Sequence, residues 1–239
     1  MVVVRGADLH RLEEIIVDLS GAAIDPRHRP VLPKLSRMEP AISVRKLSVS
    51  GRPVKVLDSE LGFDFGASNV QLNQTQTSDG KISLVLYQVG SGEMRAAIAR
   101  KELDRLIAKV AAIAADKQGV TIDNVQVDLT SHATRALEAK VTVSARKLLF
   151  RTSLRLSGTV TVSDDLVATL SDLRCEGDGT IGALVCAAVT PHFSRIEKRP
   201  FSLSALPIGE VRVNDVAITV DEKQIMVEAR FGSQTARPS

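Results

Sequence analysis

The sequence predicts an α+β fold in which long antiparallel strands are covered on one face by a few amphipathic helices. Most of the chain after Ala41 alternates apolar and polar residues with a period of two, which is typical of half-buried strands. The turns between these segments are short, which favours antiparallel pairing. Two later segments carry apolar residues at helical spacing, and strands and helices do not alternate as a parallel α/β fold requires.

The composition is that of an ordinary globular protein with an aliphatic core. The chain has 239 residues, of which 44% are hydrophobic and 25% charged, so it is long enough to bury a substantial core. Aromatic residues make up only 3% and tryptophan is absent. The net charge of +3 is small, and stacking aromatics are few, so nucleic-acid binding is not expected.

The first 40 residues are predicted to be an N-terminal helix followed by a proline-rich basic linker. Residues 7–24 place five apolar side chains on one helical stripe, with Asp8 as the N-cap. These side chains are Leu9, Leu12, Ile15, Ile16 and Leu19. Four prolines between residues 26 and 40 then exclude a continuing helix.

A single α+β domain is predicted over residues 41–231, with a flexible tail at 232–239. Its first strands end near residue 99, and Met94–Ala99 is either the end of a strand or the first turns of the helix that follows. The helix that follows carries Leu103, Leu106, Ile107 and Val110 on one face. Strands are predicted at 120–130, 136–150, 151–163 and 165–175, then a second amphipathic helix at 180–197 and the final strands.

One motif resembles a dinucleotide-binding fingerprint. Gly177, Gly179 and Gly182 have G-x-G-x-x-G spacing between a predicted strand and a predicted helix. The strand belongs to an antiparallel run, however, and too few residues follow to build a doubly wound sheet. We therefore interpret the motif as a glycine-rich strand-to-helix turn and expect no cofactor.

No catalytic or metal-binding constellation is evident. His10, His28, His132 and His192 are scattered, without the spacing of a metal site. No nucleophile elbow is present, so the protein is not expected to be an enzyme. Cys175 and Cys186 lie eleven residues apart and are either two buried thiols, which we favour, or a disulfide.

The start of the chain does not resemble a secretory signal, because its apolar run of three valines is too short. No segment reaches the ~18 apolar residues that cross a bilayer. As written, the chain is expected to be cytoplasmic or peripheral to a membrane, and to belong to the cell envelope if a leader has been removed.

The final third of the chain resembles the LmeA-like lipid-binding family. The resemblance rests on "IEKRPFSLSALPIGEVRVNDVAITVDEKQIMVEARF", with support from "LGFDFGASNVQLNQ" and "MRAAIARKELDRLIAK", and it extends over about Ala41 to Phe231. It implies a tubular lipid-binding (TULIP-like) fold: a strongly curved antiparallel sheet wrapped around a long amphipathic helix, with an apolar groove inside. The expected architecture is this curved sheet and central helix, with one additional helix near the N-terminus and another in the C-terminal third of the chain.

The resemblance implies non-enzymatic binding of a phospholipid or another acyl-chain amphiphile, for transfer or for sensing. The implied groove lining is Leu103, Leu106, Ile107, Val110, Val141, Val143, Leu154, Leu156, Val160, Val162, Leu184 and Phe193. Arg27, Arg29, Lys34 and Arg37 are candidate headgroup contacts. Basic clusters near Arg45, Arg146 and Arg195 are either the polar outer face of strands or a rim that attracts anionic headgroups. The alternative function is a scaffold module with a fully packed interior that binds a protein partner; the oligomeric state is left open.

Overall fold

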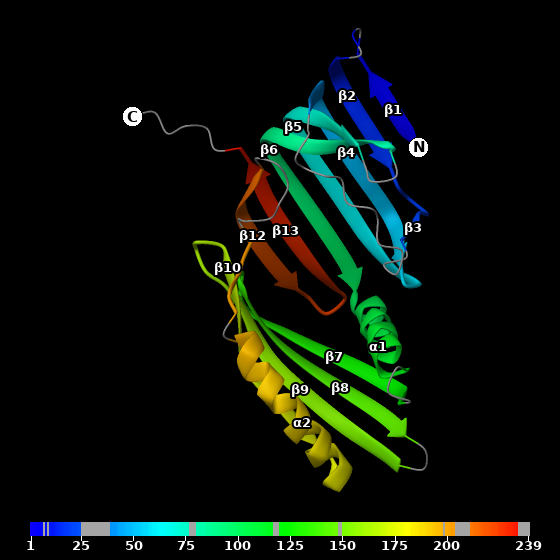
Figure 1. The fold of residues 1–239 in the computed structure, drawn as a ribbon, viewed down its shortest axis with the longest axis vertical. Coiled ribbons are helices and arrows are strands. Elements are labelled where there is room, and N and C mark those ends of the chain that lie inside the picture. The colour runs from blue at the N-terminus through cyan, green and yellow to red at the C-terminus, as the bar shows by residue number, and fades with distance from the viewer. Residues whose placement is uncertain are drawn as a thin grey trace.

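A computed structural model of the chain shows an α+β protein, built mostly of strands in two sheets with two helices (Figure 1). The structure describes residues 1–6, 8, 10–24, 39–76, 80–116, 120–147, 150–197, 199–203 and 211–233. The predicted fold class and the predominance of antiparallel pairing are confirmed.

The larger sheet contains both the first and the last strands of the chain. Its order is β1-β2-β4-β5-β6-β13-β12, and β3 pairs with β4. The strands are β1 (Val2–Arg5), β2 (Arg11–Asp18), β3 (Ala23–Ile24), β4 (Glu39–Val56), β5 (Ser59–Gln76), β6 (Ile82–Ala99), β12 (Arg212–Val220) and β13 (Gln224–Gly232). Strands β4, β5 and β6 form a first meander. The C-terminal hairpin of β12 and β13 is added to its edge, because β13 pairs with β6.

The smaller sheet is an antiparallel meander with the order β11-β10-β9-β8-β7. Its strands are β7 (Thr121–Ala133), β8 (Ala136–Lys147), β9 (Phe150–Val162), β10 (Val167–Gly177) and β11 (Phe201–Ser202). The four long strands match the four segments predicted after residue 119. Alternation with a period of two therefore located these strands correctly.

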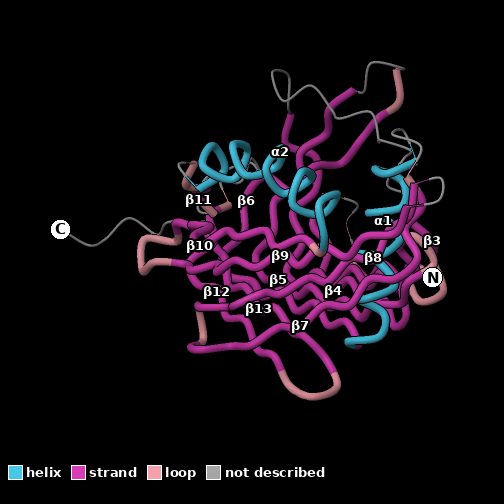
Figure 2. Tube along the Cα trace, turned by 90° about the horizontal axis from the view of Figure 1, so that it is seen from below, coloured by secondary structure: helices cyan, strands magenta, loops and turns pink. Residues whose placement is uncertain are grey.

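Two helices accompany the strands, α1 (Arg100–Asp116) and α2 (Gly179–Glu197). Helix α1 packs mainly along β7, and α2 packs along β10 and β9. Seen along the long axis of the molecule, α2 crosses one side of the strands (Figure 2). Met94–Ala99 is the end of strand β6, because it pairs with Gln224–Ala229 of β13, so α1 begins only at Arg100.

The predicted N-terminal helix is wrong. Residues 11–18 form β2, which pairs with β1 on one side and, in parallel, with β4 on the other. The run Ile15-Ile16-Val17 is β-branched, which suits a strand. Because both faces of such a strand are partly covered, its apolar residues do not alternate, and their spacing also fits a helix.

The predicted single curved sheet wrapped around a helix is also wrong. The chain forms two separate sheets, and neither is strongly curled (Figure 1). The edge of β6 is occupied by β13, with Ala96 opposite Val227, so β7 cannot extend the first meander. Helix α1 accordingly lies beside the smaller sheet instead of inside a rolled one.

The core of the larger sheet is centred on a row of side chains across four neighbouring strands. Leu12, Val44, Val70 and Val89 lie opposite one another, and none is more than 8% exposed. Burying a side chain of this size contributes about 1.5–3 kcal/mol. Phe231 joins the same cluster and stacks on Phe65, with ring centroids 5.1 Å apart.

The two sheets meet through a second, smaller apolar cluster. Val162 and Leu166 come from the β9–β10 hairpin, whereas Val216 and Ala229 come from β12 and β13. The amide of Ile218 in β12 donates to the carbonyl oxygen of Thr134 in the β7–β8 turn at 2.9 Å. The contact between the sheets therefore combines apolar burial with backbone hydrogen bonding.

Arg135 fixes this junction by reaching from the β7–β8 turn to two carboxylates and a carbonyl. Its guanidinium lies 2.5 Å from Asp215 and 2.7 Å from Asp164, and Nε donates to the carbonyl of Val216 at 3.2 Å. The hydrogen bond from Arg135 lowers the pKa of Asp215. The same hydrogen bond raises the pKa of Arg135. The folded state thus favours the ionised pair.

Replacing Asp215 with asparagine is expected to destabilise the protein at neutral pH and to matter progressively less in acid. Because folding lowers the pKa of this carboxyl, its contribution is complete above its ordinary pKa and is lost as pH falls through the lowered value. Thermal unfolding midpoints of wild type and Asp215→Asn, followed from neutral pH to about pH 2, should therefore converge. Asp165→Asn, one residue beyond Asp164, is the control; a gap between wild type and Asp215→Asn that stays constant with pH would contradict the role of Arg135.

Candidate functional site

One face of the smaller sheet is aliphatic across three strands. Directly paired residues of antiparallel strands point to the same side. Two rows of paired residues, Val127–Val141–Leu156 and Val125–Val143–Leu154, therefore share a face. Adding Leu129 and Val160, which have the same parity, defines the set that we call the aliphatic face. Val125 is buried, but the other members remain partly exposed.

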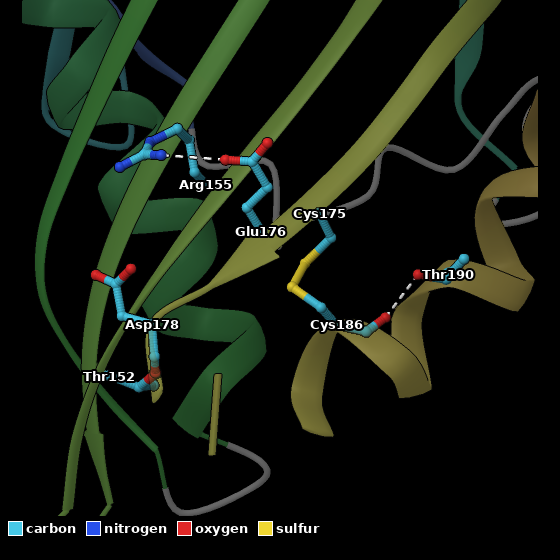
Figure 3. Close-up of a disulfide and its surroundings, with 7 residues drawn as sticks. All are labelled: Thr152, Arg155, Cys175, Glu176, Asp178, Cys186 and Thr190. Atoms are coloured by element: carbon cyan, nitrogen blue, oxygen red, sulfur yellow. Dashed lines mark hydrogen bonds and ion pairs between the residues drawn. A yellow bond between two sulfur atoms is a disulfide. The ribbon is translucent and has the colours of Figure 1, made fainter. Parts of the chain in front are cut away.

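The opposite face of the same strands is polar and charged. Arg155 lies between Thr142 and Glu176 and pairs with Glu176 at 3.1 Å (Figure 3). On the same side, the pKa of Glu138 is lowered by hydrogen bonds from Lys140, which has the larger effect, and from His132. These charges compensate one another around a hollow of about 520 Å³. The sheet therefore separates a balanced charged surface from the aliphatic face, whose side chains carry no hydrogen-bonding group.

Helix α2 is seated on the end of β10 by two glycines. A Cβ added to Gly177 would meet the backbone carbon and oxygen of Gly182 at 2.2 Å, so the two backbones are in direct contact. Gly179, the first residue of the helix, has a φ of 68°, in the left-handed region that glycine adopts more readily than other residues. The G-x-G-x-x-G spacing is thus explained by a strand-to-helix turn and by close packing of the helix on the strand.

A disulfide joins the same two elements. Cys175 of β10 is bonded to Cys186 of α2 (Figure 3). Of the two alternatives for this pair, the structure contains the disulfide, and the favoured reading of two free thiols is wrong. Cys175 lies opposite Leu156 in the ladder, so the bridge holds α2 on the same side of the sheet as the aliphatic face. Near the other end of the helix, Glu197 accepts a hydrogen bond from the amide of Leu173 at 2.8 Å.

Helix α1 satisfies backbone groups along the free edge of β7. Asp104 accepts a hydrogen bond from the amide of Val127 at 2.9 Å, and Arg100 donates to the carbonyl of Leu129 at 3.2 Å. Arg100 also donates to the carbonyl of Asp221 in the β12–β13 turn at 2.8 Å. Unpaired backbone groups on a strand edge can pair with another chain, and two of those on β7 are satisfied by α1 instead.

The structure places most of the predicted lining residues in partly buried positions near or on the smaller sheet. Leu103, Leu106 and Ile107 are partly buried on α1, whereas Val110 is 49% exposed. The strand residues of the prediction, Val141, Val143, Leu154, Leu156 and Val160, belong to the aliphatic face, and Val162 is buried in the junction between the sheets. Phe193 is partly buried on α2.

Leu184 is placed differently from the prediction. It is 66% exposed on the outer side of α2 and does not face the sheet. The inner stripe of this helix consists of Gly182, Val185, Cys186, Val189, Phe193 and Glu197. The prediction includes Phe193 of this stripe but not its small residues Gly182 and Cys186, because a close helix–strand contact selects small residues and apolar spacing alone does not indicate them. The spacing of Gly182 and Cys186, four residues apart, is the signal that indicates it.

The candidate headgroup residues Arg27, Arg29, Lys34 and Arg37 lie outside the described residues. The basic clusters on the strands are largely paired. Their ion pairs are Arg45–Glu13, Lys46–Glu14, Arg52–Asp64, Lys55–Glu60 and Arg146–Asp123. Within the described part of the chain, Arg195 and Arg199 form no ion pair and are exposed. The cluster at the end of α2 therefore differs from those on the strands.

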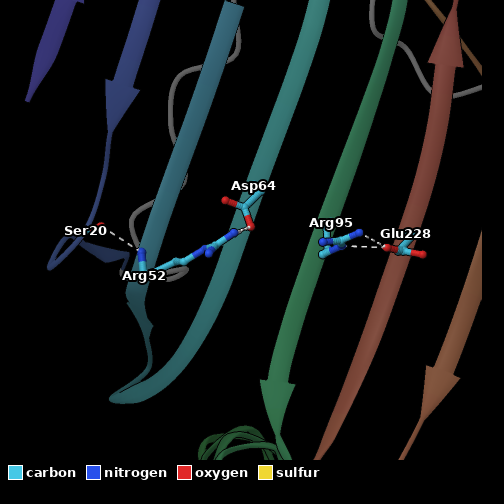
Figure 4. Close-up of polar contacts among 5 residues, drawn as sticks. All are labelled: Ser20, Arg52, Asp64, Arg95 and Glu228. Atoms are coloured by element: carbon cyan, nitrogen blue, oxygen red, sulfur yellow. Dashed lines mark hydrogen bonds and ion pairs between the residues drawn. The ribbon is translucent and has the colours of Figure 1, made fainter.

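A polar face of the larger sheet carries a ladder of opposite charges. Arg52 pairs with Asp64 across β4 and β5, and Arg95 Nε donates to Glu228 at 2.7 Å across β6 and β13 (Figure 4). A hollow of about 480 Å³ lies over these residues. Because each of these four charges has a partner, we assign the ladder to sheet stability.

The described residues provide neither a metal-binding site nor a membrane-spanning helix. No group of three or more His, Cys, Asp or Glu side chains there is arranged to hold a metal ion. Neither described helix combines the length and apolar character needed to cross a membrane.

Comparison with known proteins yields no relative. No protein-family model matches the chain, no curated protein matches it, and no solved structure matches it. The resemblance to the LmeA-like family therefore stays a prediction.

Proposed function

We propose that this protein binds the hydrocarbon chain of a phospholipid or another acyl-chain amphiphile on the aliphatic face of the smaller sheet, without catalysing a reaction. One observation carries the proposal: an all-aliphatic surface spans β7, β8 and β9 and stays partly exposed beside α2. Contiguous apolar surface of this kind is usually reserved for a partner or a ligand.

The chemistry of this face favours hydrocarbon over a peptide. A bound peptide brings backbone N–H and C=O groups that need hydrogen-bond partners when they are buried. The side chains of Val141, Val143, Leu154 and Leu156 supply none. An acyl chain has no such groups, and its flexible methylenes adapt to a surface of branched aliphatic side chains without aromatic rings.

The energetics allow useful affinity from this surface alone. Each buried methylene contributes about 0.8 kcal/mol, so about a dozen contribute about 10 kcal/mol before costs. Loss of translational and rotational freedom and ordering of the chain offset several kcal/mol of this. Net binding remains favourable with few polar contacts.

Binding is tested with a fluorescent fatty acid and with mass spectrometry of solvent extracts of the purified protein. Val143→Asp is expected to lower the affinity at least about tenfold, because a charge then lies in the path of the acyl chain. Thr142→Asp is the matched control, since Thr142 is the neighbouring residue on the same strand and points to the polar face.

If the aspartate variant does not fold, Val143→Thr takes its place in the test, because threonine has nearly the same shape as valine but carries a polar hydroxyl group. Equal affinity of the Val143 and Thr142 variants would show that the fatty acid binds elsewhere. Protein that carries no lipid and binds no fatty acid would favour the alternative of a scaffold module with a protein partner.

A further inference from the structure

Helix α2 is apolar on both of its sides. The inner stripe packs on β10 and β9, as described above. The outer stripe, which we define as Ile181, Leu184, Ala188, Pro191 and Arg195, follows helical spacing on the opposite side and is exposed at every position. Ile181 is 38% exposed and Leu184 is 66% exposed. A helix that is hydrophobic all round is normally buried on all sides, so the outer stripe of α2 lacks a partner among the residues that the structure describes.

The charges within α2 are concentrated at its C-terminal end, while the exposed Asp178 lies just before its first residue. From Gly179 to Ser194 the helix has no Asp, Glu, Lys or Arg. Its one acidic residue, Glu197, is turned toward the sheet, where it accepts the hydrogen bond from the amide of Leu173. Arg195 at the end of the stripe and Arg199 just beyond the helix are exposed and form no ion pair with the described residues.

We propose that the outer stripe of α2 docks on the surface of an anionic lipid bilayer. Helices that lie in a membrane interface bury an apolar side at the boundary of headgroups and acyl chains, and their cations approach anionic headgroups. The outer stripe has both features and contains no carboxylate, and Asp178 lies at the end of α2 away from Arg195. A bilayer is favoured over a protein partner because the free arginines adjoin an apolar strip without hydrogen-bonding side chains.

The position of α2 between the outer stripe and the smaller sheet connects membrane docking with acyl-chain binding. This step of the proposal rests on the proposed function. The inner side of α2 lies on the sheet that carries the aliphatic face, and the disulfide fixes the helix there. A bilayer held against the outer stripe is therefore one helix diameter away from the acyl-chain site. Docking brings the site to its source of lipid.

The absence of tryptophan makes the test direct. Leu184→Trp introduces a single indole at the centre of the stripe. Its emission is expected to shift to the blue with vesicles of equal parts phosphatidylcholine and phosphatidylglycerol, and not with phosphatidylcholine alone. Ile82→Trp, at a residue that is 72% exposed on β6 of the other sheet, is the matched probe and should not shift.

Sedimentation with the same vesicles tests the roles of the side chains. Leu184→Glu and the double variant Arg195→Gln, Arg199→Gln are each expected to lose most of the vesicle-bound fraction. Leu84→Glu, at an exposed residue of β6, should keep it. Added salt should weaken binding of the wild type more than binding of the arginine variant.

The two proposals fail in different ways. An indole at residue 184 that stays in water with every vesicle overturns docking, even if fatty acid still binds in solution. Loss of self-association in Leu184→Glu, measured by sedimentation velocity, would also overturn docking in favour of a second copy of the chain. Vesicle docking by a protein that binds no fatty acid would refute the proposed function alone.

Discussion

A Gly177→Ala substitution is expected to lower the free energy of unfolding by about 3 kcal/mol. The added Cβ would lie 2.2 Å from the backbone carbon and oxygen of Gly182, closer than atoms approach in folded proteins. Both groups are backbone, so no side chain can rotate to relieve the contact. The strand and the helix have to separate, and the packing between them is lost.

Urea unfolding followed by circular dichroism measures this effect. The control is Gly62→Ala on β5, where the added Cβ meets only the carbonyl oxygen of Ala97 at 3.8 Å, an ordinary contact. That variant should stay within about 0.5 kcal/mol of wild type. Similar losses in both variants would indicate a general intolerance of alanine in these strands and would contradict the special role of Gly177.

The reciprocal substitution sharpens the argument. In Gly182→Ala the added Cβ would lie 2.6 Å from the backbone carbon of Gly177 and 2.8 Å from Oγ1 of Thr152. Because both substitutions push the same two backbones apart, the double variant should cost less than the sum of the two single variants. Additive losses would show that the two glycines do not act at one contact.

The strands were predictable from sequence because their signal is local. Alternation of apolar and polar residues located β7 to β10. The C-terminal segments were likewise recognised as β12 and β13. Each of these strands has one covered face, so burial leaves a period-two pattern in the sequence.

The division into two sheets was not predictable in the same way. It depends on which strand occupies the edge of β6, and β13 lies more than 120 residues further along the chain (Ala99 pairs with Gln224). Pairing of Leu12 with Val44 likewise makes β2 a strand, although its apolar spacing fits a helix. Such long-range choices are decided by tertiary packing, which overrides local propensity.

The candidate site was predictable in part, for the same reason. The strand residues Val141, Val143, Leu154 and Leu156 share a face because strand periodicity dictates it. The orientation of α2 was missed, because it is decided by where a glycine and a cysteine allow close approach. Hydrophobicity alone pointed to Leu184, which instead faces outward.

Replacing Cys175 and Cys186 together with serine is expected to lower the free energy of unfolding by about 3 kcal/mol. The bridge closes a loop between residues eleven apart in sequence, and removing it restores conformational freedom to the unfolded chain. Denaturant unfolding under oxidising conditions measures the loss. Dithiothreitol should reproduce most of it in wild type and change nothing in the serine variant.

The location of the lost stability shows whether the disulfide acts as a local clamp on α2 or stabilises the whole fold. Without the bridge, α2 is held by the contact of Gly177 with Gly182 and by the hydrogen bond from Leu173 to Glu197. Amide hydrogen exchange should therefore rise sharply in α2 and little in β4 to β6, whose core row around Val70 does not involve the helix. An apolar dye should bind more strongly to the serine variant, because a helix that detaches more often uncovers its own inner stripe and the side chains of β10 and β9 that it covers. Uniform acceleration of exchange across both sheets would contradict a local clamp, since it would mean that opening α2 requires the whole chain to unfold.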